Sequence, residues 1–84
     1  MSLPAQPVTL TVEQIGELNQ KLADMRHDIN NHLSLMIAAV EMIRHKPQTS
    51  ERMLGAITER LPKISESMVK FSGDFEKSFG ITRQ

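Results

Sequence analysis

The sequence predicts an all-α protein: an antiparallel two-helix hairpin that dimerises into a four-helix bundle. Apolar residues recur at alternating spacings of three and four over about 11–45 and about 50–79, as in coiled-coil packing. The segments are separated by only a few residues around Pro47, which predicts antiparallel neighbours. A chain of 84 residues without cysteine builds only a marginal core alone, so we expect a homodimer.

The composition argues against several classes of protein. Ten basic and ten acidic residues cancel, and tryptophan and tyrosine are absent, so neither a basic nucleic-acid surface nor a base-stacking platform is expected. No apolar run reaches the roughly 18 residues of a membrane span. The N-terminus has no signal-peptide pattern, and the lack of cysteine fits an intracellular compartment. We therefore expect a cytoplasmic protein with no membrane segment in this chain.

The first helix is expected to follow an extended or disordered lead-in over residues 1–10, which contains two prolines. Thr11 is a candidate N-cap, with Gln14 three residues later as its capping-box partner. No charge occurs from Ile29 to Val40. This apolar surface predicts either a buried bundle core or, with residues 57–64 of the second helix, a docking surface for another protein domain.

The second helix has candidate signals at both ends. Thr49 or Ser50 is expected to cap its start. Pro62 lies inside the apolar pattern and predicts a local kink. Gly80 is a candidate C′ residue for a Schellman ending, followed by a short tail over 81–84.

A polar cluster lies inside the first helical pattern: His27, Asp28, Asn30, Asn31 and His32. At about 100° per residue, His27 and Asn31 share an outward stripe, Asp28 lies nearer the core, Asn30 flanks the stripe, and His32 occupies the apolar seam. An exposed imidazole is a competent nucleophile toward phosphorus. A nearby carboxylate can assist proton transfer, and an amide can bind phosphoryl oxygens without adding negative charge.

The run His27-Asp28-Ile29-Asn30-Asn31-His32-Leu33 resembles the H-box of the dimerisation and histidine-phosphotransfer domain of two-component sensor histidine kinases. The resemblance covers about residues 11–80 and depends mainly on this motif. It implies that His27 is the phosphoacceptor, Asp28 its acid-base partner, Asn31 a contact for phosphatase activity and Asn30 a polar support. His32 stands where many members have proline, so the usual bend after the phosphoacceptor is in doubt.

The resemblance also implies the partners. His27 would pass its phosphoryl group to an aspartate of a response-regulator receiver domain. No nucleotide-binding motif follows the hairpin, so we expect no cofactor in this chain, with ATP and magnesium supplied only by partner domains. The chain is then either a fragment of a kinase or a stand-alone phosphotransfer protein, served by a separate ATP-binding kinase domain.

Two other interpretations of the cluster remain open. The hairpin could be a non-catalytic dimerisation scaffold, in which His27, Asp28 and Asn31 are ordinary surface residues. Asp28 and His32 are also four residues apart and could share a metal ion, although a protein site needs three or four converging ligands. His32 itself fits a seam residue that sets register or oligomeric state.

Overall fold

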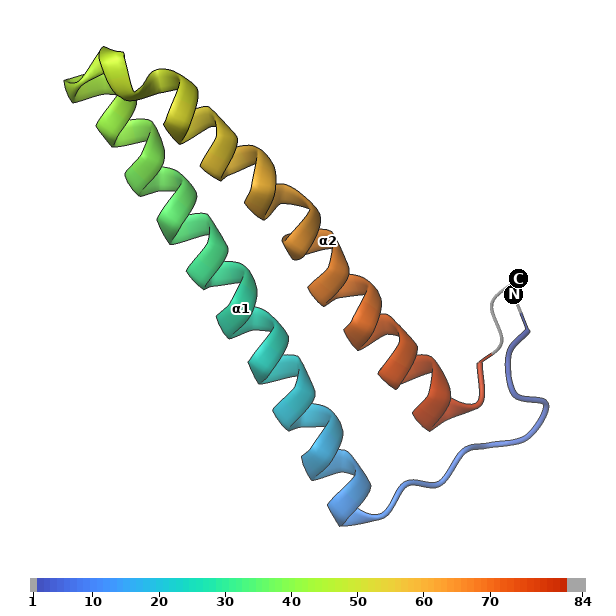
Figure 1. The fold of residues 1–84 in the computed structure, drawn as a ribbon. Coiled ribbons are helices and arrows are strands. Elements are labelled where there is room, and N and C mark those ends of the chain that lie inside the picture. Colours follow the sequence, from blue (N-terminus) through green and yellow to red (C-terminus); the bar gives the residue numbers. More distant parts are fainter. Residues whose placement is uncertain (1, 82–84) are drawn as a thin grey trace.

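The structure, a computed structural model, describes residues 2–81. It consists of helix α1 (Val12–His45), a short 3-10 helix η1 (Pro47–Thr49) and helix α2 (Ser50–Phe79). The two long helices pack side by side and antiparallel, joined by η1 (Figure 1). The predicted all-helical hairpin is therefore confirmed.

The start of α1 is fixed by the predicted capping box. The Gln14 backbone N–H donates to Thr11 Oγ1 at 3.1 Å, and the Thr11 N–H donates to Gln14 Oε1 at 2.8 Å. These bonds satisfy backbone donors that have no partner within the helix. Arg44 and His45 occupy the last turn, where the helix dipole favours cations.

The start of α2 matches the prediction in position but not in its capping bond. Thr49 is the N-cap residue, but neither its side chain nor that of Ser50 caps the helix. Their hydroxyls instead donate backwards, Thr49 to the Lys46 carbonyl at 2.7 Å and Ser50 to the Pro47 carbonyl at 2.6 Å. The reason is that η1 runs directly into α2, so Thr49 already has helical backbone angles and its hydroxyl is not placed to accept from the next turn.

The end of α2 has the predicted Schellman geometry. Gly80 has φ 66° and ψ 32°, in the left-handed region. The Ile81 N–H donates to the Glu76 carbonyl at 2.8 Å and the Gly80 N–H to the Lys77 carbonyl at 3.4 Å, the two bonds of that motif. Pro62 lies within α2, which continues through it as one helix.

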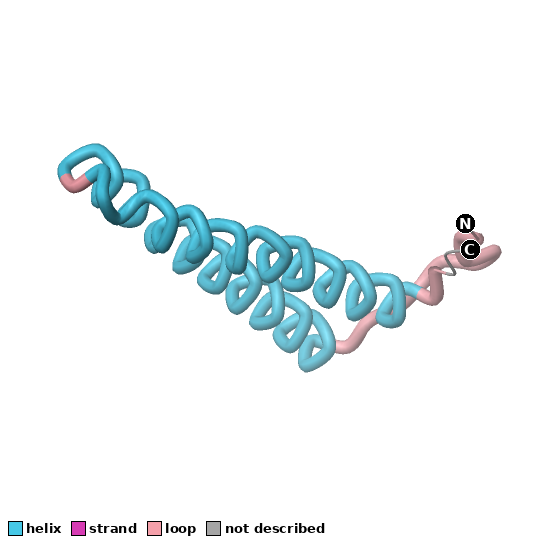
Figure 2. Tube along the Cα trace, turned by 45° about the horizontal axis from the view of Figure 1, so that its top comes forward, coloured by secondary structure: helices cyan, strands magenta, loops and turns pink. Residues whose placement is uncertain are grey.

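The hairpin is a single layer of two helices (Figure 2). Its extents are 58 × 28 × 12 Å and its radius of gyration is 18.1 Å, against about 12 Å for a compact domain of this length. Within residues 2–81, Ala39 is the only buried residue, at 6% exposed. A layer one helix thick leaves both of its broad faces uncovered.

The apolar seam of each helix divides into two rows. Half-buried residues face the other helix, while an exposed apolar residue lies three positions before most of them. The pairs, exposed residue first, are Ile15 and Leu18, Leu22 and Met25, Leu33 and Met36, Val40 and Ile43, Leu54 and Ile57, Leu61 and Ile64, Met68 and Phe71. Three positions correspond to a rotation of about 60°, so the exposed row lies beside the buried row.

The exposed rows of the two helices point to the same side of the hairpin. Neighbouring antiparallel helices are related by a two-fold axis perpendicular to their common plane, so the same rotation in each leads to the same face. Leu33, Ile37 and Val40 of α1 accordingly line one shallow groove with Ile57 of α2. We call this side the apolar face, formed by Ile15, Leu22, Leu33, Val40, Leu54, Leu61, Met68 and Phe75.

Apart from buried Ala39 and the half-buried residues that face α2, the charge-free half of α1 is therefore left exposed within one chain. Leu33 and Leu35 are each 42% exposed, and Ile37 is 63% exposed. A single hairpin has too few elements to cover a helix that is apolar on most sides. Neither helix, over the part of the chain that is described, is long and apolar enough to cross a bilayer.

Candidate functional site

His27 lies near the middle of α1, far from both helix ends. Met25 and Ile29, two residues before and after it, are half-buried against α2, whereas His27 is exposed. Residues two apart on a helix diverge by about 160–200°, so the imidazole is directed away from α2. The 34-residue helix has no internal proline, which gives the ring a rigid support.

Asp28, Asn30 and Asn31 are exposed beside His27. Asn31 lies one turn after His27 on the outward side, and such i,i+4 residues are neighbours on a helix surface. Within residues 2–81, no hydrogen bond or ion pair joins His27 to Asp28 or to Asn31. Consecutive helical residues diverge by about 100°, which is why adjacency in sequence does not bring His27 and Asp28 into contact.

Asp28 instead lines an open depression of about 300 Å³ between the helices. Its wall from α1 includes Lys21 and Asp24, and its wall from α2 includes Lys70 and Asp74. Lys21 Nζ lies 3.7 Å from Asp74 Oδ1 across the groove. We call this depression the polar groove; its full lining is Lys21, Asp24, Met25, Asp28, Ser67, Lys70, Phe71 and Asp74.

The polar groove and the apolar face lie on opposite sides of the hairpin. Asp28 comes three residues after half-buried Met25, and Ser67 three after half-buried Ile64. A residue three positions after a half-buried residue lies on the opposite side of it from the exposed apolar residues, which come three positions before one. The cluster around His27 therefore remains open to solvent if the apolar face is covered.

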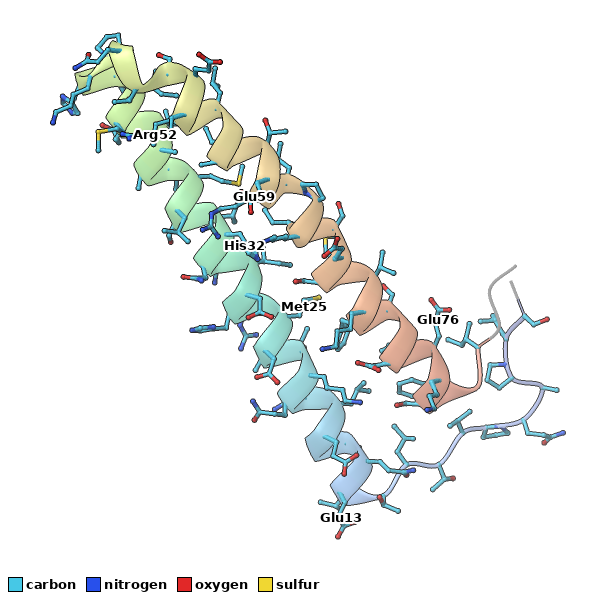
Figure 3. The ribbon with its side chains drawn as sticks, viewed as in Figure 1. Glu13, Met25, His32, Arg52, Glu59 and Glu76 are labelled. Atoms are coloured by element: carbon cyan, nitrogen blue, oxygen red, sulfur yellow. The ribbon has the colours of Figure 1, made fainter. Side chains whose placement is uncertain are left out.

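His32 faces α2 rather than the His27 cluster. Its ring is half-buried, and Nδ1 lies 3.1 Å from Nη1 of Arg60. Figure 3 places His32 on the side of α1 that faces α2. The sequence predicted the inward position of His32, but it did not identify Arg60 as its partner. A usable signal is that Arg60 lies between Ile57 and Ile64, at spacings of three and four.

The geometry gives no support to the metal interpretation. Among residues 2–81, no group of three or more His, Cys, Asp or Glu side chains is arranged to hold a metal ion. The Nδ1 atom of His32 is already bonded to Arg60. Asp28 and His32 are therefore better described as a surface carboxylate and a helix-contact histidine.

The arrangement as a whole is an exposed imidazole on the outer side of a long helix, with polar side chains around it. Chemistry at such a site depends on a second protein for water exclusion and for most substrate contacts. In the comparisons with known proteins, no family model, no curated protein and no solved structure matches this chain.

Proposed function

We propose that this chain is a histidine phosphotransfer module of two-component signal transduction, in which His27 accepts a phosphoryl group and passes it to a receiver aspartate. The observation that carries the proposal is the exposed His27 ring in the middle of a rigid helix, inside the H-box-like run His27 to Leu33. An interior position for His27 would have prevented access by a second protein, and a frayed position would not have held the ring on a rigid support.

The proposed transfer has two steps. The lone pair of an imidazole nitrogen attacks phosphorus, an N–P bond forms, and the P–O bond to the donor breaks as that oxygen leaves with its electrons. The proton on the other ring nitrogen passes to the Asp28 carboxylate as the N–P bond forms. A carboxylate oxygen of the receiver then attacks phosphorus, the N–P bond breaks, and the proton returns from Asp28 to the ring, which regenerates neutral imidazole. The receiver supplies magnesium, and an ATP-binding kinase domain, on the same protein or a separate one, supplies the phosphate.

Three neighbours of His27 receive supporting roles. Asp28 is proposed to assist proton transfer when the helix is docked, through a side-chain rotation, because the resting structure has no bond between the two residues. Asn31 is proposed to hydrogen-bond phosphoryl oxygens or orient a water molecule in dephosphorylation. Asn30, exposed on the far side of the stripe, supports the polar surface.

A homodimer is part of this proposal, with a second copy of the chain covering the apolar face. Leu54, Leu61 and Met68, spaced seven residues apart, are 55%, 51% and 52% exposed. This regular row is the pattern that helix bundles bury. A two-fold pairing of two hairpins through this face completes a four-helix bundle and leaves the exposed residues His27, Asp28, Asn30 and Asn31 accessible.

The test is a transfer assay with a phosphorylated donor, either a kinase domain or a phosphorylated receiver. The wild-type chain is expected to acquire acid-labile, base-stable phosphate, and His27→Gln is expected to acquire none. His45→Gln is the matched control, because His45 is also an exposed histidine of α1 and should not affect labelling. Undiminished label on His27→Gln would refute the assignment.

The exposed apolar row also favours a second candidate, a dimerisation scaffold without phosphate chemistry. The two candidates make different predictions for the triple variant His27→Gln, Asp28→Asn, Asn31→Ala. The scaffold predicts that a bound receiver or client is retained with unchanged affinity. The phosphotransfer proposal predicts loss of transfer with the dimer intact, which is measured on the same samples by light scattering.

A further inference from the structure

A side-chain hydrogen bond joins the helices near the middle of the hairpin, between Arg60 Nη1 on α2 and His32 Nδ1 on α1, at 3.1 Å in a partly buried setting. The guanidinium of arginine has only donors and stays protonated. The imidazole nitrogen must therefore be the acceptor. This requires a neutral His32 ring with its proton on Nε2.

Protonation of His32 would change this contact in two ways. Nδ1 would become a donor facing another donor, so the hydrogen bond would be lost. The imidazolium would also carry a positive charge next to the guanidinium, in a partly buried setting where solvent screens the repulsion less than at the surface.

We propose that His32 and Arg60 form an acid-sensitive clasp between α1 and α2, closed while the imidazole is neutral and opened by its protonation. Loss of this contact weakens the packing of α1 against α2 around His32 and Arg60. For the phosphotransfer proposed above, on which this consequence depends, the opened state lowers transfer because Asn31 and Asp28 are supported by the same turn of α1.

The surrounding charges favour this behaviour. On α1, residues 29–40 carry no charge apart from His32 itself, and Asp28, one turn earlier, lies on the polar-groove side without an ion pair to His32. On α2, the charged neighbours of Arg60 are Glu59 and Lys63, which pair with each other at 3.8 Å. No carboxylate within residues 2–81 thus forms an ion pair that would compensate a protonated His32.

The effect of protonating the other two histidines must be distinguished from the effect of protonating His32. His45 Nε2 lies 3.6 Å from Glu41 Oε2, and protonation strengthens that contact, so it opposes the proposed effect. His27 is exposed. The experiment therefore uses a His27→Gln, His45→Gln background, in which His32 is the only remaining histidine of the chain.

Thermal unfolding of this background protein at about pH 7.5 and about pH 5.5, on either side of the usual histidine titration, tests the proposal at one fixed chain concentration. Adding His32→Asn provides a side-chain acceptor near the position of Nδ1 that does not titrate. The His32 protein is expected to lose at least about 4 °C more in Tm on acidification than its His32→Asn counterpart. Arg60→Met is expected to remove most of that difference. Equal losses in the His32 and His32→Asn proteins would overturn the proposal.

Ring-nitrogen NMR of His32 in the same background keeps the proposal testable if His32→Asn does not fold. At about pH 7.5, Nδ1 is expected to be unprotonated and Nε2 protonated. A proton on Nδ1 at that pH would contradict the clasp. Because neither measurement involves phosphate, failure of the clasp and failure of phosphotransfer are distinguishable.

Discussion

His27 and Asn31 lie one helical turn apart on the exposed side of α1, while Met25 and Ile29 beside them pack toward α2. The imidazole of His27 and the amide of Asn31 therefore share one stripe that a docking protein can contact together. The seam residues hold this stripe in place without taking part in the chemistry. This separation between a supporting side and an exposed side leads to the following predictions.

Asp28→Asn is expected to slow phosphorylation of His27 by roughly 100-fold or more, because general acid-base groups typically contribute that much. Asn31→Ala is expected to leave phosphorylation largely intact and to slow dephosphorylation of a bound receiver. Rates are measured by rapid-quench labelling, with circular dichroism confirming unchanged helix content. Equal rates in wild type and Asp28→Asn would remove Asp28 from the mechanism.

Met68→Glu is expected to disrupt the proposed dimer, because it places a charge in the apolar face. Val69→Glu is the matched control: it introduces the same charge one residue along, at a position that is 71% exposed and rotated by about 100°. Sedimentation velocity should give a dimer for wild type and Val69→Glu and a smaller or unfolded species for Met68→Glu. A monomeric wild type would refute the bundle, as would an intact Met68→Glu dimer.

Gly80→Ala is expected to lower the free energy of unfolding by about 1 kcal/mol, because Gly80 has φ 66° and a Cβ is disfavoured in the left-handed region. Gly73→Ala, inside α2 with open space around an added Cβ, is expected to raise stability by about 0.5–1 kcal/mol. Urea unfolding at one chain concentration measures both. The two variants should therefore change the free energy of unfolding in opposite directions. A stabilising Gly80→Ala would contradict the Schellman ending.

The sequence was sufficient for the fold because the deciding signals are local. Alternating apolar spacing, the Thr11 to Gln14 capping box and Gly80 depend on residues a few positions apart, and each is confirmed. At the start of α2, Thr49 is the N-cap residue, as one of the two predicted alternatives, but the expected side-chain capping bond is absent, because the 3-10 turn that begins at Pro47 directs the Thr49 hydroxyl back to the Lys46 carbonyl.

The cross-helix contacts could not be predicted in the same way. Whether Arg60 or a neighbouring residue meets His32 depends on the register of the helices, which the geometry of η1 determines. The same applies to Lys21 and Asp74, 3.7 Å apart but far apart in sequence. The outward position of His27 followed from helical periodicity alone, whereas its proposed role depends on chemistry that only a partner protein would complete.

The most direct test of the central claim is to map the phosphate itself. The chain is incubated with a phosphorylated receiver domain, kept at neutral pH, and digested for tandem mass spectrometry under conditions that preserve N–P bonds. The phosphotransfer proposal predicts phosphate on His27 and none on His32 or His45. Phosphate confined to another residue, or none transferred from or to any receiver or kinase tried, would contradict it.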